Sequence, residues 1–242
     1  DIINPAQSAF IKGRDIIGNV LICQDLIKMY GRGVCSPRIL MKLDLQTAYD
    51  SVEWDFMNDM LVELGFPDRI HKLILQCVSP PSYTFAVKGE SFGFVKGKRG
   101  LRQGDPLSPL LFTLCLEYLS RLIETIQRHP QYRYHPLCKS IKLSHLCFAD
   151  DLILFSKGDV MSVNLLCFAF EKFSRASGLK MNKQKSGFYC NGVSQDRIEQ
   201  VTRITGINRG KLPFNYLGIT VSPKRLSVKD CKCLVEKLAQ KI

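Results

Sequence analysis

Asp150 and Asp151 stand side by side between two short apolar runs, residues 146–148 and 152–155, that have the composition of β-strands. Like charges a few ångströms apart repel, so a site that keeps them together needs a compensating charge. A divalent cation such as Mg²⁺, which prefers carboxylate oxygens, is the simplest source of that charge. An Asp-Asp pair is also an ordinary hairpin corner, because Asp tolerates tight-turn backbone angles. This segment alone leaves both interpretations open.

A third carboxylate, Asp44, ends another apolar run at residues 39–44. Two strands that present acids from distant parts of the chain give the arrangement used in two-metal phosphoryl transfer, in which the ions lie about 3.5–4 Å apart. The alternative is an exposed charge pair of Lys42 and Asp44 at a strand end. The three acids together favour the phosphoryl-transfer interpretation.

Residues 100–109, Gly-Leu-Arg-Gln-Gly-Asp-Pro-Leu-Ser-Pro, form a glycine-punctuated loop before a third apolar stretch. We predict a core helix from Leu110 to about Ile126, with Ser108 as its N-cap and Pro109 in its first turn. The loop carries more polar side chains than a helix cap requires, which favours a further role for it.

The elements that must position these residues follow from apolar periodicity and from glycine and proline stops. We expect the helix after Asp44 to begin with a capping box formed by Asp50 and Glu53. Ser227 is expected to cap a last helix. The predicted helices span residues 16–30, 50–64, 68–78, 110–126, 161–177 and 194–205, and the predicted strands span residues 39–44, 83–87, 92–95, 141–148, 152–156, 188–191 and 216–221 with a partner.

The ordered series of motifs resembles the reverse transcriptases of LINE-type (non-LTR) retrotransposons, plant-like members especially. It comprises Lys-x-Asp-x-x-x-Ala-Tyr-Asp at 42–50, the loop at 100–109 and Phe-Ala-Asp-Asp at 148–151. Residues 7–14 are similar to that family's fingers-side segment, 177–186 to its fourth motif and 216–219 to its primer grip. The match extends from about Gln7 to Ile242.

The resemblance implies an α+β fold: a right-hand polymerase palm whose antiparallel sheet is backed by helices, with partial fingers and a truncated thumb. Residues 1–242 are then a fragment of a reverse transcriptase domain. Residues 1–37 are partial fingers, 38–225 the palm with inserted fingers elements, and 226–242 the start of the thumb. The endonuclease and the rest of the thumb are expected elsewhere in a parent polyprotein.

By the same resemblance, Asp44 and Asp150 bind two Mg²⁺ ions, for which Mn²⁺ is an alternative. Asp151 is expected to be a third, weaker or outer ligand. The main-chain carbonyl of Leu45 is expected to complete one coordination sphere. Lys185 resembles the fourth-motif lysine that protonates the leaving pyrophosphate, although a solvated loop lysine would look the same in the sequence.

The resemblance also assigns contacts to the nucleotide and to the nucleic acid. Tyr49 would lie under the incoming sugar and exclude a ribose 2′-hydroxyl, unless it is a core aromatic. Gln103 is expected to contact the sugar or base of the nucleotide, Arg102 the nucleotide or only a template phosphate, and Gly104 belongs to the nucleotide-binding loop. Tyr216, Leu217 and Gly218 are expected to form a turn against the primer. Arg14 and Lys12 are candidates for contacts with the triphosphate or the template.

Composition and charge agree with a nucleic-acid partner. The chain has 242 residues, 45% of them apolar, which is enough for a substantial core. Its formal charge is +12, and residues 171–242 alone hold 15 Lys and Arg against 5 Asp and Glu. A basic surface suits phosphate groups, although surface lysines also serve solubility.

The ten cysteines lack the paired spacing of a metal site, and most stand in apolar runs that suit a core. No secretory signal and no run of membrane-span length is present, so we expect an intracellular protein without a membrane partner. The family resemblance adds the nucleus as a location.

The predicted function is RNA-directed DNA polymerisation, with a dNTP, an RNA template and a DNA primer as partners. One alternative is an inactive transposon relic that at most binds nucleic acid. Another is a different palm-type polymerase, such as an RNA-templated RNA polymerase, against which Tyr49 argues. The intact acids Asp44, Asp150 and Asp151 favour the first function.

Overall fold

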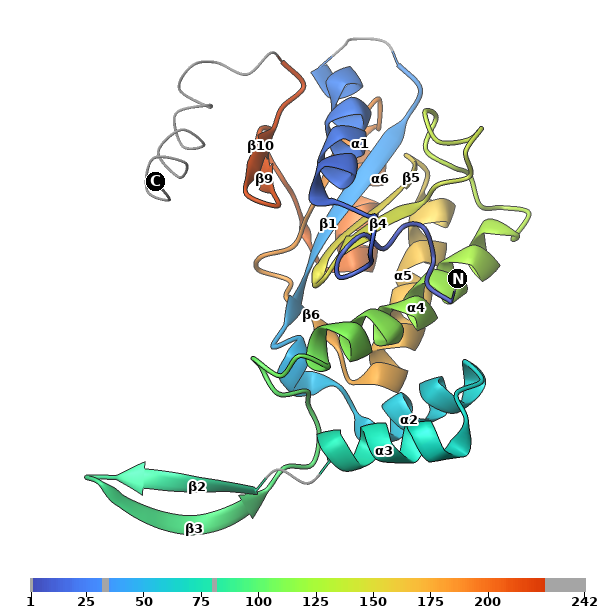
Figure 1. Cartoon of the computed structure of the whole chain (residues 1–242). Helices are drawn as coiled ribbons and strands as arrows, with labels where there is room; N and C mark the ends of the chain where they lie inside the picture. The colour runs from blue at the N-terminus through green and yellow to red at the C-terminus, as the bar shows by residue number, and fades with distance from the viewer. Residues whose placement is uncertain (1, 32–34, 80–81, 225–242) are drawn as a thin grey trace.

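The computed structural model describes residues 2–31, 35–79 and 82–224, and within them the centre is a six-stranded sheet (Figure 1). Its order is β4-β5-β1-β7-β8, and the short β6 also pairs with β1. Neighbouring strands are antiparallel except β7 and β8, which are parallel. The strands are β1 (Arg38–Gln46), β4 (His145–Phe148), β5 (Asp151–Lys157), β6 (Lys180–Met181), β7 (Gly187–Asn191) and β8 (Asn208–Arg209).

Four helices contribute side chains to the larger core, which lies on one face of this sheet. From β1, alternate residues enter that core because successive side chains in a strand point to opposite faces. Ile39, Met41, Leu43 and Leu45 are the residues concerned. The helices are α2 (Trp54–Glu63), α4 (Ser108–Gln127), α5 (Val160–Ser177) and α6 (Gln195–Thr205).

A smaller core covers only part of the opposite face. It is formed by α1 (Ile16–Lys28) and by the hairpin of β9 (Phe214–Tyr216) and β10 (Ile219–Val221). Beneath them lie Leu40 of β1 and Phe155 of β5, both fully buried. The sheet is therefore enclosed on one side and only half enclosed on the other.

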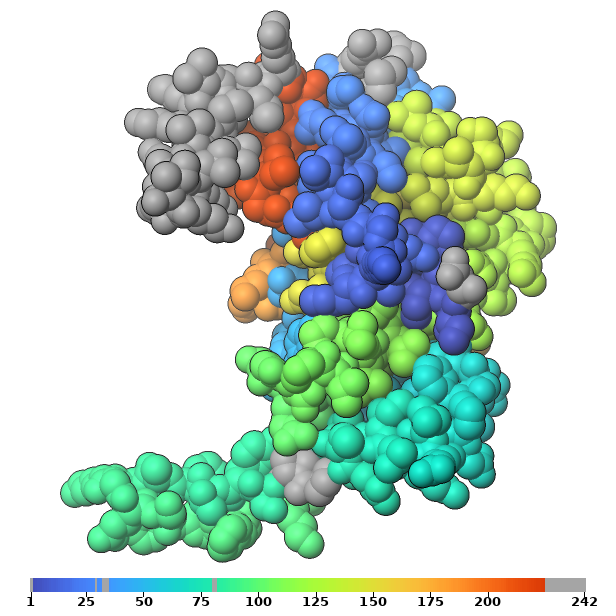
Figure 2. Space-filling model, viewed as in Figure 1, coloured from blue at the N-terminus to red at the C-terminus, as the bar shows by residue number. Residues whose placement is uncertain are grey.

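The hairpin of β2 (Ser82–Val87) and β3 (Glu90–Lys96) projects away from the body after α3 (Asp68–Val78). Figure 2 shows it as a separate arm, and every residue in both strands is exposed. No helix in the described part of the chain is long and apolar enough to cross a membrane.

The α+β architecture and most element boundaries agree with the sequence-based expectation. The helix at residues 68–78 was predicted with its observed ends, and α5 ends before Gly178, whose left-handed φ of 79° stops it. The two-residue strands β6 and β8 were not predicted, because elements this short carry no periodic signal. The prediction of one strand over residues 216–221 was wrong: Leu217 and Gly218 have left-handed φ values of 51° and 80°, so the chain turns there between β9 and β10.

Three expectations about element ends were wrong. Ser108 is the first helical residue of α4 and not its cap; the N-cap is Leu107, which makes no side-chain capping bond. The strand predicted from residue 141 begins only at His145, since Lys142 has a φ of 51° that interrupts an extended strand. Pro109 lies in the first turn of α4, as predicted.

The third error concerns the capping box expected at Asp50 and Glu53. Asp50 lies in the short 3₁₀ turn η2 (Tyr49–Ser51), and α2 begins at Trp54. Glu53 is the N-cap residue without a side-chain capping bond, and its main-chain N–H donates to Ser177 O at 3.0 Å. The predicted domain boundaries stay a prediction, and residues 226–242, with the cap at Ser227, lie outside the described residues.

Gly178 allows a direct stability test of how α5 meets η2. A Cβ at Gly178 would lie 2.5 Å from Ser51 O, whereas Gly65, with a similar φ of 77°, has nothing within 4 Å of its Cβ position. Gly65→Ala should cost about 1 kcal/mol for the left-handed backbone alone. Gly178→Ala should cost at least about 1 kcal/mol more, because the clash adds to the same strain. Denaturant unfolding measures both, and equal losses would contradict the described contact.

Candidate active site

The pairing of β1 with β5 brings the predicted acids together. Asp44 lies directly opposite Asp151, so both side chains project from the same face of the sheet. Asp150 stands in the two-residue turn between Phe148 and Asp151, next to Ala149 with its left-handed φ of 51°. Three carboxylates from two distant segments thus meet at one end of the sheet.

These acids are accessible because the smaller core stops short of them. Asp44 and Asp151 lie on the same sheet face as the buried Leu40 and Phe155, but further toward the end of the strands. Asp44 and Asp151 are half-buried, and Asp150 is exposed. The open half of this face is where a substrate can approach the carboxylates.

The charges of the site influence each other. Burial raises the pKa of Asp151, the charge of Lys42 lowers it, and the charges of Asp150 and Asp44 raise it. Lys42 Nζ lies 4.0 Å from Asp151 Oδ1 and is two residues from Asp44 on the same strand face. Burial is the largest cause of the net upward shift, and repulsion from the two neighbouring carboxylates adds to it.

The chemistry of the donor set fits a hard divalent cation, because the set consists of carboxylate oxygens. The raised pKa of Asp151 also means that its ionised form is disfavoured without an added positive charge. Within the described residues, however, no group of three or more His, Cys, Asp or Glu side chains is arranged to hold a metal ion. Asp44, Asp150 and Asp151 thus meet at the strand ends without forming such a group. Their assignment as metal ligands remains a prediction.

Tyr49 follows β1 in η2 and lies next to this site. Its ring stacks on Phe112 of α4, with centroids 4.9 Å apart and planes at 24°. Burial raises the pKa of Tyr49, and the charge of Asp150 raises it further, which places the phenol within electrostatic reach of the turn. The ring is half-buried, so it has both a packed side and an accessible side.

The glycine-punctuated loop is fastened to η2. Leu101 N donates to Tyr49 O at 2.7 Å, and Gly100 N donates to Val52 O at 2.8 Å. Gly100 has a φ of 96°, and a Cβ there would lie 2.9 Å from Asp50 O, so only glycine allows this approach. The loop is thereby held against the turn that carries Tyr49.

Within this loop, Gln103 and Gly104 are exposed, which leaves them accessible for the predicted nucleotide contact. Arg102 already has partners: its Nη2 donates to Cys77 O at 2.7 Å and lies 3.3 Å from Asp105 Oδ2. A phosphate contact from Arg102 would compete with these interactions.

Lys185 is exposed in the turn between β6 and β7. β6 pairs with the end of β1, where Leu45 lies opposite Met181. The side chain of Leu45 is a buried hydrocarbon without a donor atom, so the residue can offer a cation only its main-chain carbonyl, as the resemblance implies. The sheet thus brings the Lys185 turn to the strand that carries Asp44.

The three residues assigned to the primer grip differ in accessibility. Tyr216 is fully buried in the smaller core, and burial raises the pKa of its hydroxyl. Leu217 and Gly218 form the turn of the β9–β10 hairpin, with φ values of 51° and 80°. Of these three residues, Leu217 and Gly218 are the accessible ones for the predicted primer contact, whereas the side chain of Tyr216 belongs to the core.

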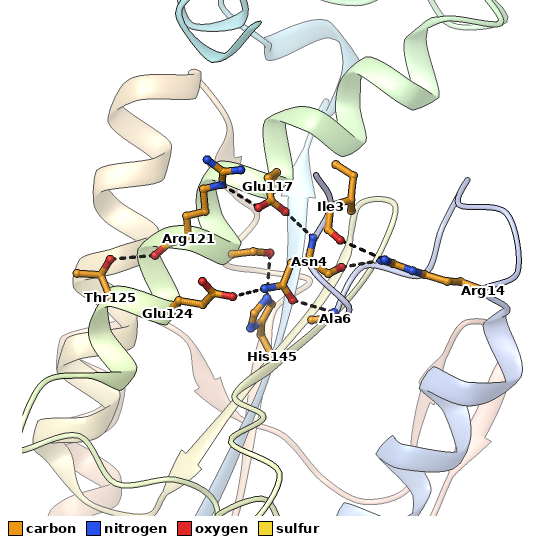
Figure 3. Close-up of polar contacts among 10 residues, drawn as sticks. Ile3, Asn4, Ala6, Arg14, Glu117, Arg121, Glu124, Thr125 and His145 are labelled. Atoms are coloured by element: carbon orange, nitrogen blue, oxygen red, sulfur yellow. Dashed lines mark hydrogen bonds and ion pairs between the residues drawn. The ribbon is translucent and has the colours of Figure 1, made fainter. Parts of the chain in front are cut away.

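Arg14 has structural partners in the N-terminal segment. Its guanidinium donates to the carbonyl oxygens of Ile3, Asn4 and Gln7 at 2.6–3.1 Å. Figure 3 shows Asn4 held between Arg14 and α4, where Asn4 N donates to Glu117 at 2.7 Å. Its predicted contact with a triphosphate or template would require these bonds to rearrange.

Sequence reasoning gave no role to Ser186 or to the Asn182 main chain, although both contact Asp44 directly. Their signal was available, since a Ser and an Asn flank the predicted lysine within five residues. Small polar residues in a loop are, however, too common to single out without the contacts.

A helix-backed sheet with one half-open face, and acids at the open end, defines the palm of a nucleic-acid polymerase. The chain matches "Reverse transcriptase (RNA-dependent DNA polymerase)" over residues 1–221 and belongs to that family. It is 28% identical over 195 residues to a retrovirus-related Pol polyprotein from type-1 retrotransposable element R2 of Popillia japonica, covering 76% of this chain and 30% of the relative.

A second relative supports the same assignment. The uncharacterized 149 kDa protein of transposon TX1 from Xenopus laevis is 26% identical over 236 residues, covering 95% of this chain and 17% of the relative. The resemblance to LINE-type retrotransposon reverse transcriptases is therefore confirmed. The chain spans at most 30% of the length of these two relatives.

Solved structures show the same fold at low identity. Telomerase from Candida albicans, in complex with a fragment of telomeric RNA, gives a TM-score of 0.59 at 14% identity, covering 89% of this chain and 33% of that chain. Telomerase from Candida tropicalis gives 0.60 at 12%, covering 92% and 34%.

Ionised Asp151 should lower the stability of the folded chain. Its folded-state pKa lies above the unfolded value, so its ionised form opposes folding; the cost is absent below about pH 3.9 and grows as pH rises through both values. Asp151→Asn should therefore raise Tm at pH 7 by on the order of 1 °C, a gain that disappears near pH 3. The exposed Asp150→Asn should gain less, and a larger gain for Asp151→Asn at pH 3 than at pH 7 would contradict the assignment.

Proposed function

We propose that this chain is the catalytic palm of an RNA-directed DNA polymerase of a non-LTR retrotransposon, which extends a DNA primer on an RNA template with dNTPs. The observation that carries the proposal is the position of Asp44 opposite Asp151, with Asp150 in the adjoining turn at the open end of the sheet. The telomerases of the same fold are in complex with RNA in two of the solved structures, which supports a nucleic-acid template here.

In this proposal Asp44 and Asp150 hold two Mg²⁺ ions, with Asp151 and the carbonyl of Leu45 beside them. When bound, such ions neutralise phosphate charge and lower the pKa of the attacking hydroxyl. Mn²⁺ has the same preference for oxygen ligands and could replace them. Their positive charge would also oppose the upward shift in the pKa of Asp151, which burial and, to a smaller extent, repulsion from Asp150 and Asp44 produce.

The remaining residues position the substrates. Tyr49 supports the deoxyribose with the accessible side of its ring, since the other side is packed on Phe112. Gln103 contacts the nucleotide from the exposed loop, and the turn at Leu217 and Gly218 contacts the primer. Positioning of this kind can supply a large part of a rate enhancement.

Lys185 is the proposed proton donor to the leaving pyrophosphate. Its exposure in a turn attached to the strand of Asp44 supports this role. Arg102 and Arg14 are weaker candidates for phosphate contacts, because each already donates to main-chain carbonyls.

A primer-extension assay that compares RNA with DNA templates and dNTPs with NTPs tests the proposed activity. We expect extension on RNA with dNTPs, and Asp150→Asn should reduce it on the order of 10²–10³-fold, because charge stabilisation of the transition state is lost. The matched control is Asp68→Asn, whose carboxylate on α3 is 91% exposed and remote in the fold from the acids. Absence of extension with retained RNA binding would instead support a relic that only binds nucleic acid.

Tyr49 should determine the choice of sugar. Tyr49→Val removes the ring that blocks a 2′-hydroxyl, so the preference for dNTP over NTP should fall about 10–100-fold in kcat/KM. Tyr49→Phe keeps the ring and its stacking on Phe112, and should keep the preference. If Tyr49→Val leaves the ratio unchanged, Tyr49 is a packing residue and another group selects the sugar.

A further inference from the structure

Along one edge of β1, the main chain of Asp44 faces a gap between two partner strands. Along the opposite edge, β1 pairs with β5 through Asp44 itself. Along the edge with the gap, β7 pairs with β1 only up to Lys42, and β6 pairs with it only from Leu45. No strand in the described chain therefore pairs with Asp44 on that edge.

The turn between β6 and β7 fills this gap with two hydrogen bonds to the same residue. Asp44 N donates to the Ser186 hydroxyl at 3.0 Å, and Asp44 O accepts from Asn182 N at 2.8 Å. A serine side chain thus takes the place of the carbonyl that a partner strand would offer. Ser186 is 7% exposed, so water cannot readily replace its hydroxyl.

Residues 182–186 also bond among themselves, which makes the turn a fixed unit. Ser186 N donates to Asn182 O at 2.9 Å. The Asn182 side-chain oxygen accepts from Gln184 N at 3.1 Å and from Lys185 N at 3.3 Å. The bonds from Asp44 to Ser186, from Ser186 to Asn182 and from Asn182 back to Asp44 form a closed ring.

We propose that Ser186 and Asn182 are positioning residues that fix the main chain of Asp44 and keep the turn that carries Lys185 beside it. The proposal builds on the proposed polymerase function, but its contacts exist without it. Ser186 would act only through Asp44, since its hydroxyl contacts the main chain of that residue. Without this bond, the Asp44 carboxylate can still bind a cation but samples more orientations.

The direct test is amide hydrogen exchange at Asp44 in the full chain. Ser186→Ala removes the acceptor of the Asp44 N–H, so exchange at that amide should become about three- to tenfold faster. Ser186→Thr keeps a hydroxyl and should restore the slow exchange. If Ser186→Ala does not fold, Ser186→Cys, which offers a poorer acceptor of similar size, should change exchange in the same direction.

The consequence for the site is measured by Mn²⁺ binding, followed by electron paramagnetic resonance without any nucleotide. Ser186→Ala should weaken Mn²⁺ binding about tenfold, because partners that orient a ligand affect metal affinity by this order. In extension assays, kcat should fall by a similar factor with little change in KM for dNTP, and Ser186→Thr should recover both readouts.

Ser162→Ala is the matched control. The Ser162 hydroxyl is also buried and also accepts a main-chain N–H, from Arg133 at 2.9 Å, but at the far end of β5 from the acids. It should lower stability without changing Asp44 exchange or Mn²⁺ binding.

The two proposals fail in different ways. A parent chain that binds Mn²⁺ but never extends a primer would defeat the proposed function and leave the role of Ser186 standing. Unchanged Asp44 exchange in Ser186→Ala, or equal effects of Ser162→Ala and Ser186→Ala on Mn²⁺ binding, would overturn the positioning role.

Discussion

The antiparallel pairing of β1 with β5 places Asp44 opposite Asp151, where like charges repel. Packing on both sheet faces maintains this pairing. A slip of one residue would move Met41 out of the larger core and Leu40 out of the smaller one. Hydrophobic burial along the strands thereby holds acids together that would separate if the strands could shift.

The unequal cover of the two faces makes those acids accessible. On the helical side, β1 is buried along its whole length through Ile39, Met41, Leu43 and Leu45. On the other side, α1 and the β9–β10 hairpin cover Leu40 and Phe155 but not the strand ends (Figure 1). The same two strands are therefore core at one end and a charged, solvent-facing surface at the other.

Three segments distant in sequence are tied to the residues around Asp44 by hydrogen bonds, which join main-chain atoms except for the bond from Asp44 N to the Ser186 hydroxyl. The loop at Gly100 and Leu101 is bonded to η2, the end of α5 to Glu53, and the turn after β6 to Asp44 itself. Main-chain contacts depend little on side-chain identity. The retention of this fold in telomerases at 12–14% identity agrees with that independence.

The sequence by itself determined the local elements and the identity of the acids. Apolar runs ending in Asp44 and flanking Asp150 predicted their strands, and Gly178 predicted the end of α5, because alternation and left-handed glycines act within a few residues. The ordered motifs also predicted the family, which the match over residues 1–221 confirms.

Only the tertiary structure decided which partners the polar residues take. It placed the ring of Tyr216 in the core, gave Arg14 to main-chain carbonyls, and put Ser186 on the amide of Asp44. The physical reason is range: periodicity reports that a side chain faces apolar or polar surroundings. A hydrogen bond between residues 142 positions apart is set by how the strands pack, which no local pattern encodes.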